Sequence, residues 1–471
     1  MADDSKLHIA LFPWLAFGHM IPYLELAKLL AQKNHKISFI STPRNIDRLP
    51  KLPPNLSNLI TFVKVPLPRI DHLPEEAQAT TDLPFDKVQY LKKAYDCLKQ
   101  PLKTFLENSD VDWLFYDFSA FWLPEIAKSV GISHGFFSIF LGATLGIVTK
   151  PASFDDDRNK PEQFTVPPKW VNFPTKVAYK LFEVIRIFES VTGDASDVSD
   201  IFRFAEVVKG CDLIAVRSCM DFEPEWLNLL QEIHGKPCIA TGMLPTTEYD
   251  TGEQTEEWIP IKEWLDKQEK ASVVYVAFGS EAKPSQDELN EIALGLELSG
   301  LPFFWVLRNR RGLSDTEVIE LPDAFEERTK ERGVVCTSWV PQLKILAHDS
   351  VGGFLTHSGW SSVVEASQYA RPLILMAFLA DQGINARILE EKKMGYPIPR
   401  NEFDGSFTGE FTGESVAESL KLVIVKEEGK IYRDKAEEMR ILFGDKQRQE
   451  MYINNFLDYL TTNKQAKAVV N

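Results

Sequence analysis

Apolar residues in the first part of the chain alternate between short continuous runs and a longer segment with helical spacing. A run from Leu7 to Trp14 is followed by a periodic segment from Met20 to Gln32, and then by a second run at Ile37–Ser41. Continuous apolar runs predict strands that are buried on both faces, as in parallel sheets covered by helices. Strand, helix and strand in this order form a βαβ unit. A further predicted strand, Trp113–Tyr116, ends at Asp117.

The second half of the chain repeats this alternation. Predicted strands and helices follow one another at Val273–Phe278, Gln286–Leu298, Pro302–Leu307, Gly353–Thr356, Ser361–Tyr369 and Pro372–Phe378. This order predicts an α/β protein in which two doubly wound, Rossmann-like domains face each other across a cleft. In open parallel sheets, ligands bind beyond the carboxyl ends of the strands. The residues that follow each strand are therefore the candidates for chemistry.

The chain has 471 residues, which is enough for two to three domains at roughly 150 residues each. A segment rich in Gly, Pro, Thr and acidic residues separates the two halves and is typical of a linker. We predict a first domain over residues 1–245, a linker over 246–260 and a second domain over 261–448. The helical tail, residues 449–471, is predicted to pack back on the first domain.

Charge and composition exclude several classes of partner. The formal net charge is -16, and an acidic chain gains nothing from counterion release, so nucleic acid is not expected as a partner. The longest apolar run, Phe136–Val148, is shorter than the ~20 residues that span a bilayer, so no membrane insertion is expected. Five scattered cysteines indicate free thiols, and the N-terminus lacks the pattern of a signal peptide. We expect a cytoplasmic protein, and a monomer.

The stretch from Trp339 to Gln382, 44 residues long, contains polar and aromatic residues at the ends of predicted strands. At its centre, His357-Ser358-Gly359-Trp360 lies where a strand ends and a helix begins. A helix N-terminus has free N–H groups and a positive dipole end, so it binds a diphosphate without lysines, and a glycine lets the backbone come close. Trp339 offers a flat π surface on which a uracil ring can stack, although a tryptophan taken alone is more often a core residue.

This stretch resembles the signature box of the plant secondary-product UDP-glycosyltransferases, a family of two-domain GT-B enzymes. The resemblance implies a UDP-sugar as donor. The residues that it assigns to UDP are Ser280, Trp339, Val340, Gln342, His357, Gly359, Ser361, Ser362 and Glu365. It assigns Trp360, Asp381 and Gln382 to the transferred sugar, with a helix N-cap as the alternative role of Asp381. Ser361 stands where the family usually has an asparagine that reaches phosphate, which leaves the contribution of Ser361 open.

A second motif, Trp14-Leu15-Ala16-Phe17-Gly18-His19, follows the first predicted strand. A hydroxyl that attacks an anomeric carbon must lose its proton, and imidazole titrates near neutrality. The family has its general base at this position. The resemblance therefore implies that His19 is the catalytic base and that Asp117 is the carboxylate that orients it. Taken alone, His19 is more often a residue at the start of a helix, and Asp117 is a turn residue.

Aromatic residues gather near the ends of the strands in the first domain and suit flat or polycyclic metabolites. The predicted acceptor-binding residues are Trp14, Phe17, Phe118, Phe121 and Trp122. The chain is similar over nearly its whole length to a subgroup that extends an existing sugar on a flavonoid or terpenoid glycoside. This similarity is carried by Phe12–His19, Leu91–Ala94, Tyr116–Phe118 and Pro399–Glu402 with Asp404-Gly405. The segment Asp381–Asn385 is similar to sequences of rhamnosyltransferases. The subgroup includes users of UDP-rhamnose and of UDP-glucose, so both donors stay open, as does transfer to an aglycone hydroxyl.

No metal-ligand spacing occurs in the sequence, so we expect no metal site and a metal-independent, inverting single displacement. The UDP-sugar is a co-substrate, and no cofactor is expected. Two other classes compete with this interpretation. One is a glycan phosphorylase or a nucleotide-sugar epimerase of related fold; against it, no lysine stands out as a cofactor anchor, and the uridine box has no use in a phosphorylase. A binding protein without catalytic activity would have no need of His19 and Asp117.

Overall fold

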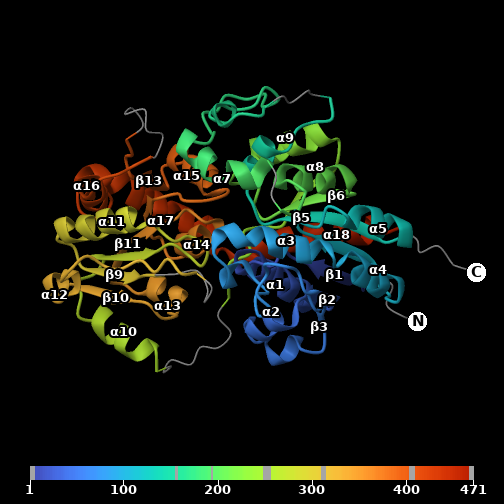
Figure 1. Cartoon of the computed structure of the whole chain (residues 1–471), viewed down its shortest axis with the longest axis horizontal. Coiled ribbons are helices and arrows are strands. Elements are labelled where there is room, and N and C mark those ends of the chain that lie inside the picture. Colours follow the sequence, from blue (N-terminus) through green and yellow to red (C-terminus); the bar gives the residue numbers. More distant parts are fainter. Residues whose placement is uncertain are drawn as a thin grey trace, which may run out of the picture.

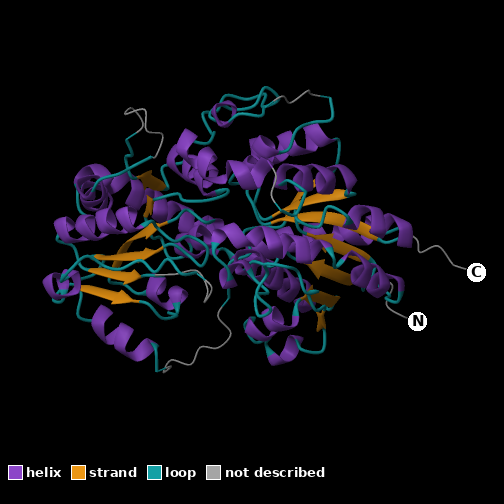
Figure 2. Ribbon diagram, viewed as in Figure 1, coloured by secondary structure: helices purple, strands orange, loops and turns teal. Residues whose placement is uncertain are grey.

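Two lobes, each built around one parallel β-sheet, form the described part of the chain (Figure 1). The computed structural model describes residues 6–153, 158–192, 195–247, 256–308, 315–401 and 409–465. Strands form the interior of each lobe, and helices cover them (Figure 2). The predicted α/β class with two Rossmann-like domains is therefore confirmed.

The sheet of the N-terminal lobe has seven parallel strands in the order β3-β2-β1-β4-β5-β6-β7. These strands are β1 (His8–Phe12), β2 (Lys36–Ser41), β3 (Ile60–Lys64), β4 (Trp113–Tyr116), β5 (Ser133–Ser138), β6 (Leu213–Val216) and β7 (Cys238–Ala240). Every residue of β1, β4, β5 and β6 is buried, because helices cover both faces of the central strands. The strand order reverses between β1 and β4, and this switch point is where doubly wound sheets bind ligands.

The C-terminal lobe repeats this plan with six parallel strands in the order β10-β9-β8-β11-β12-β13. They are β8 (Val273–Ala277), β9 (Phe303–Val306), β10 (Gly333–Cys336), β11 (Val351–Thr356), β12 (Leu373–Leu375) and β13 (Gly395–Pro397). The central pair, β8 and β11, is fully buried. Here the order reverses between β8 and β11, so the segments that follow these two strands lie at the second switch point.

Helices connect the strands in both lobes. The N-terminal lobe contains α1 (Phe17–Gln32), α2 (Pro43–Arg48), α3 (Val88–Asp96), α4 (Lys99–Glu107), α5 (Leu123–Val130), α6 (Gly142–Val148), α7 (Leu181–Thr192), α8 (Asp200–Gly210) and α9 (Pro224–His234). The rest of the chain contains α10 (Trp258–Leu265), α11 (Gln286–Ser299), α12 (Phe325–Thr329), α13 (Gln342–Ala347), α14 (Trp360–Ser367), α15 (Gln382–Glu391), α16 (Gly413–Ile424), α17 (Lys430–Gly444) and α18 (Lys446–Asn463).

Local signals explain where some helices begin and end. Helix α11 begins after Ser285, whose hydroxyl accepts from the backbone N–H of Glu288 while the Glu288 carboxylate accepts from the N–H of Ser285, and it ends at Gly300 in the left-handed conformation. Helix α1 begins at Phe17, earlier than the apolar spacing predicts, because periodicity detects only the buried face and Phe17, Gly18 and His19 are only partly buried. The early start puts His19 in the first turn of the helix.

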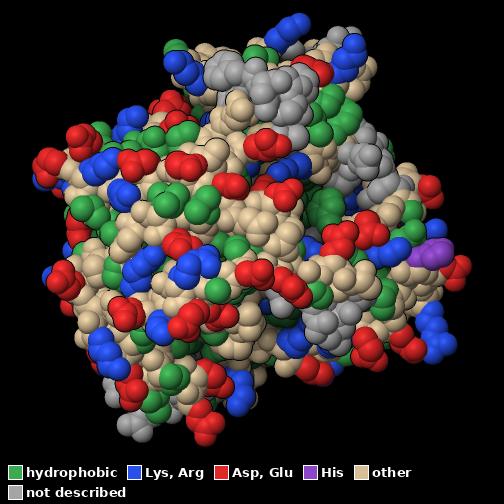
Figure 3. All heavy atoms as spheres, turned by 60° about the vertical axis from the view of Figure 1, so that its left-hand side comes forward, with side chains coloured by type: hydrophobic (Ala, Val, Ile, Leu, Met, Phe, Trp, Pro, Cys, Tyr) green, Lys and Arg blue, Asp and Glu red, His purple; other side chains and the backbone are tan. Residues whose placement is uncertain are grey.

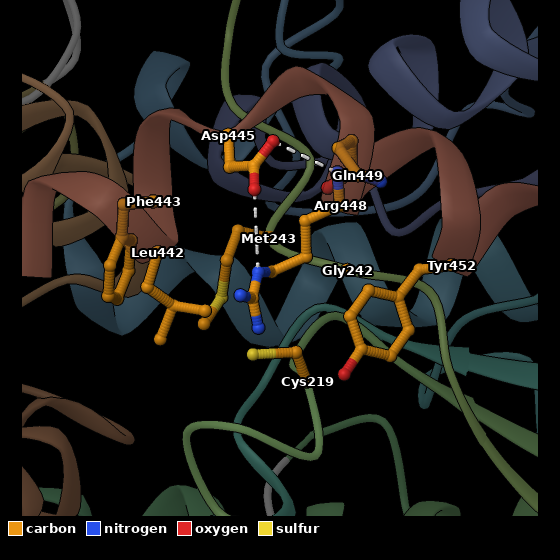
Figure 4. Close-up of a pocket in the computed structure, with 9 residues that line it drawn as sticks. All are labelled: Cys219, Gly242, Met243, Leu442, Phe443, Asp445, Arg448, Gln449 and Tyr452. Atoms are coloured by element: carbon orange, nitrogen blue, oxygen red, sulfur yellow. Dashed lines mark hydrogen bonds and ion pairs between the residues drawn. The ribbon is translucent and has the colours of Figure 1, made fainter.

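Helix α18 ends the described chain and packs on the N-terminal lobe, where it lies among elements from the first half of the sequence (Figure 1). The indole N–H of Trp113 in β4 donates to the carbonyl of Leu460 at 3.0 Å, and the ring of Phe456 lies 5.3 Å from that of Phe115. A small pocket lies where α18 leaves α17, and Gly242 and Met243 line it together with residues of both helices (Figure 4). The C-terminal segment therefore connects the two lobes a second time.

Acidic and basic side chains alternate over the face of the molecule shown in Figure 3, without a broad basic area on that face. None of the helices in the described residues is long and apolar enough to cross a membrane.

Candidate active site

His19, in the first turn of α1, and Asp117, directly after β4, follow two adjacent strands of the first sheet and meet at its carboxyl edge. His19 Nδ1 lies 2.7 Å from Asp117 Oδ2, and the Asp117 carboxylate also accepts the backbone N–H groups of Trp14 at 3.1 Å and Phe118 at 2.8 Å. A carboxylate only accepts, so Nδ1 carries the proton and Nε2 has the free lone pair. Asp117 is fully buried, and the His19 side chain is 13% exposed. The pair has the geometry of a general base held in one tautomer.

Aromatic rings surround the His19 imidazole. Phe118 and Phe140 lie with ring centroids 5.8 and 5.2 Å from it, and Trp14 packs edge-on at 6.2 Å from Phe118. Of the predicted acceptor residues, Trp14 and Phe118 are thus near the base. Phe17 is partly buried at the start of α1, under the guanidinium of Arg48. An acceptor hydroxyl presented to His19 would therefore meet an apolar wall, and contact of these rings with an acceptor stays a prediction.

Two of the predicted acceptor residues pack elsewhere. Trp122 lies 6.2 Å from the ring of Tyr95, and its indole N–H donates to Asp96. Phe121 packs against Phe202 and lies under the guanidinium of Arg203. Among the described residues, neither ring contacts His19. Contact of these two side chains with an acceptor stays a prediction, and their observed contacts fix the turn after β4.

His357 closes the strand β11 and is packed between two glycines. A Cβ atom on Gly279 would lie 2.8 Å from the imidazole Cε1, and a Cβ on Gly359 would lie 2.2 Å from Nε2. These clashes explain why both positions lack a side chain, and Gly279 also has φ +70°. Burial lowers the pKa of His357 to about 4, so the ring is neutral at neutral pH. Its Nδ1 has no hydrogen-bond partner within the described residues.

The N-terminus of α14 follows directly and has no capping side chain. The N–H groups of its first turn have no carbonyl within the helix to bind, so they are free for an anion. Ser361 and Ser362 lie in this first turn, and Gly359 precedes it. Ser280 lies in the turn after β8, next to Glu281, whose carboxylate accepts from the Thr80 hydroxyl of the other lobe at 2.6 Å. The residues predicted for the diphosphate therefore come from two adjacent strand ends.

Trp339 lies in the loop after β10 with its indole open to solvent. All ten tryptophans are in the described residues, and Trp339, at 68% exposure, is the only one classed as exposed. Such exposure is unusual for a tryptophan and leaves its flat face free for a base. Val340 beside it is buried and anchors the loop. The alternative of a core tryptophan does not hold for this residue.

Gln342 and Glu365 form a polar pair below this loop. The Gln342 amide N–H donates to Glu365 at 2.6 Å, and the other Glu365 oxygen accepts from Thr246 of the linker at 2.9 Å. Tyr275 donates to the Gln342 carbonyl at 3.0 Å, which fixes the amide orientation. Burial raises the pKa of Glu365, and the two hydrogen bonds act in the opposite direction. A carboxylate held in this way can still accept from a ribose hydroxyl through its remaining lone pairs.

Asp381 and Gln382 lie at the start of α15 in the C-terminal lobe, Asp381 directly before the helix and Gln382 as its first residue. Burial raises the pKa of Asp381, while hydrogen bonding from Asn385 at 2.7 Å and the nearby charge of His19 act in the opposite direction. The Gln382 carbonyl accepts the backbone N–H groups of Phe378 and Leu379, both at 2.9 Å. This leaves the Gln382 amide N–H as the group available to a sugar. An acid of the C-terminal lobe therefore lies near enough to the base of the N-terminal lobe to interact with it electrostatically.

Trp360 is buried, and its side chain is fully engaged away from the cleft. Its indole N–H donates to the carbonyl of Arg217 at 3.0 Å, and its ring packs 5.3 Å from Phe222 and 5.9 Å from Phe443. These contacts leave only the Trp360 backbone for the sugar contact predicted from the sequence. The alternative N-cap role of Asp381 also lacks support, because its side chain makes no capping hydrogen bond.

Sequence reasoning missed Arg217 and Asn385. Arg217 directly follows β6, so the rule that strand ends carry chemistry could have found it. Asn385 lies in the similar segment Asp381–Asn385 but was given no role; it donates to the carbonyl of Ser358 at 3.0 Å as well as to Asp381. It thus connects the diphosphate turn to the sugar side of the cleft.

Within the described residues, no group of three or more His, Cys, Asp or Glu side chains is placed to hold a metal ion. The metal-independent reaction stays a prediction.

Comparison with known proteins identifies the family. A family model described as UDP-glucoronosyl and UDP-glucosyl transferase matches residues 203–450. UDP-glycosyltransferase 91A1 of Arabidopsis thaliana is 57% identical, over 98% of each chain. This protein is a plant UDP-glycosyltransferase.

Other relatives of this glycosyltransferase are consistent with that assignment. Soyasaponin III rhamnosyltransferase of Glycine max is 41% identical, over 98% of this chain and 96% of its own. The solved structure of UGT71G1 from Medicago truncatula, complexed with UDP-glucose, aligns with a TM-score of 0.75 at 23% identity, over 98% of this chain and 100% of its own. At this identity the solved structure supports the GT-B fold alone.

Proposed function

We propose that this glycosyltransferase transfers rhamnose or glucose from its UDP-sugar to a sugar hydroxyl of a small plant glycoside, of the flavonoid or terpenoid class. The observation that carries the proposal is the placement of the His19–Asp117 pair on one lobe beside Asp381 on the other. The soybean relative is named for rhamnose transfer and for soyasaponin III, which supports a rhamnosyl donor.

The chemistry follows from the positions of the side chains. With Nδ1 bonded to Asp117, the Nε2 lone pair of His19 takes the proton of the acceptor hydroxyl as its oxygen attacks the anomeric carbon. The bond from that carbon to the UDP oxygen breaks, and the attack from the opposite face inverts the centre. The free N–H groups at the start of α14 stabilise the charge that develops on the diphosphate.

The carboxyl of Asp381 favours an acceptor that carries a sugar over an aglycone without sugars. An acceptor hydroxyl near His19 is also near Asp381, a buried carboxyl that accepts from Asn385 at 2.7 Å and keeps further lone pairs for a sugar hydroxyl. A sugar ring supplies several hydroxyls to such a site, whereas an aglycone supplies one or two. Transfer directly to an aglycone hydroxyl is the alternative function.

The test is a donor and acceptor screen of the purified protein, with product masses as the readout. UDP-rhamnose and UDP-glucose are offered with matched pairs of an aglycone and its monoglycoside, and the product gains one deoxyhexose or one hexose. The proposal expects the glycosides to be preferred. His19→Ala should abolish transfer while UDP affinity stays within about twofold, since the base contacts the acceptor. A preference for aglycones would contradict the proposed acceptor class. Turnover by His19→Ala would contradict the role of His19 as the base.

A further inference from the structure

Arg217 is buried at the boundary between the lobes, and its polar groups bind two segments that are far apart in the sequence. Its Nε and Nη2 donate to the carbonyls of Met243 at 2.9 Å and Leu244 at 3.1 Å, where the chain leaves the first domain. Its Nη1 donates to the Ser361 hydroxyl at 2.7 Å, and its own carbonyl accepts from Trp360. Arg217 therefore bonds both of the first two residues of α14 from the other lobe.

The charge of this guanidinium lacks a direct partner. Among the described residues, no carboxylate forms an ion pair or hydrogen bond with Arg217, which is 1% exposed. Burial lowers its pKa to about 10, and the charges of Glu365 and Glu25 act in the opposite direction. A buried charge without a contacting counter-ion is costly. An anion bound at the N-terminus of α14 would supply the missing negative charge.

Ser361 is placed to connect the guanidinium with such an anion. Its oxygen accepts from Arg217, so its own hydrogen stays free to donate. A hydroxyl that accepts from a cation is polarised and becomes a stronger donor. Ser361 also lies in the uncapped first turn of α14, where the free N–H groups are found. Ser361 stands where the family usually has an asparagine, and it is the side chain of α14 to which Arg217 donates.

We propose that Arg217 is a positioning residue for the diphosphate of the donor, acting on it across the lobe boundary through the Ser361 hydroxyl. Arg217 holds the first turn of α14 in place and supplies a positive charge, and Ser361 donates to a phosphate oxygen. This inference rests on the proposed function, because it requires a nucleoside diphosphate as ligand. It also explains why a chain without the asparagine can keep a diphosphate site.

Binding of UDP and of uridine, measured by isothermal titration calorimetry, tests the proposal. Uridine has the base and ribose but no phosphate, so the ratio of the two dissociation constants isolates the diphosphate contacts. Ser361→Ala should weaken UDP about tenfold or more, the range for a hydrogen bond to a charged group, and leave uridine within about twofold. Arg217→Met should weaken UDP at least as much. Because the two residues act in series, the double variant should lose little more than Arg217→Met alone.

Two matched controls separate this role from folding. Arg371 donates to the backbone carbonyls of Leu346, Val351 and His348 and lies before β12, away from the carboxyl edge of the sheet, so Arg371→Met should keep the UDP-to-uridine ratio. Ser367→Ala, at the other end of α14, controls for a lost hydroxyl. If Arg217→Met does not fold, Ser361→Ala decides the question.

The outcomes are distinct. Unchanged UDP affinity in Ser361→Ala, or equal losses of UDP and uridine affinity, would overturn the role of the Arg217–Ser361 pair. Wild-type protein that binds neither UDP nor uridine would instead overturn the proposed function. A loss confined to UDP, shared by Ser361→Ala and Arg217→Met but by neither control, supports the proposal.

Discussion

Replacing Asp117 by asparagine tests the catalytic pair with the smallest change in shape. Asp117 accepts three hydrogen bonds, from His19 Nδ1 and from the backbone N–H groups of Trp14 and Phe118. An asparagine has only one oxygen, so its amide N–H₂ must face at least one of these donors. If the N–H₂ faces His19, the imidazole takes the tautomer with the proton on Nε2. That tautomer cannot accept a proton from the acceptor hydroxyl.

The expected loss can be worked from the 2.7 Å contact. Its carboxylate and imidazolium charges lie about 4 Å apart between centres, and such a pair contributes about 4 kcal/mol at the effective dielectric near a protein surface. Removing this stabilisation from the transition state lowers kcat about a thousandfold. The corresponding exchange in a Ser-His-Asp site costs about 10⁴ in kcat, largely through the wrong tautomer. We therefore expect a decrease in kcat of about 10³ to 10⁴ for Asp117→Asn.

The assay is steady-state transfer with product quantified by mass, alongside UDP binding by calorimetry. UDP affinity should stay unchanged, because Asp117 belongs to the acceptor lobe. Asp112→Asn is a matched control: it lies just before β4 and accepts the backbone N–H of His8 at 2.8 Å, far from His19 along the strand. Asp117→Asn protein that is folded, binds UDP and keeps more than about a tenth of wild-type kcat would refute the reasoning.

Three further predictions concern the C-terminal lobe. Trp339→Ala should weaken UDP binding by about 1–3 kcal/mol, the range for a base stacked on an aromatic ring; an unchanged dissociation constant would exclude the stacking. Trp360→Ala should cost about 3–5 kcal/mol in urea unfolding, because the ring packs between Phe222 and Phe443; near-wild-type stability would contradict this. The folded pKa of His357, about 4, lies below its ordinary 6.5, so the unfolded chain binds the proton first and stability falls as pH decreases from 6.5 to about 4. His357→Gln should reduce this dependence of stability on pH by about 1 kcal/mol per pH unit. Burial also lowers the pKa of His234 to about 4, so His234 should account for part of the pH dependence that the variant keeps. Equal pH dependence in wild type and variant would disprove this prediction.

The apolar runs determined the class of fold, because a strand covered on both faces must be apolar at every position. The strand Trp113–Tyr116 was predicted with the bounds that it has as β4, and Asp117 follows it. The strand-end rule put His19 and Asp117 after strands of the first sheet and His357 after a strand of the second, and the resemblance to the family supplied their roles. These are local properties, and a single segment is enough to specify them.

Contacts between segments far apart in the sequence were decided by tertiary structure alone. No local pattern distinguishes Trp360, which packs on Phe222 and Phe443, from Trp339, which is exposed, although both belong to the same motif. Arg217 and Ser361 lie 144 positions apart and meet only because the two lobes pack against each other. The sequence determined which residues stand at the ends of strands, because burial of each strand is a local requirement. The packing of one lobe on the other decided which of these residues meet, because that depends on surfaces assembled from the whole chain.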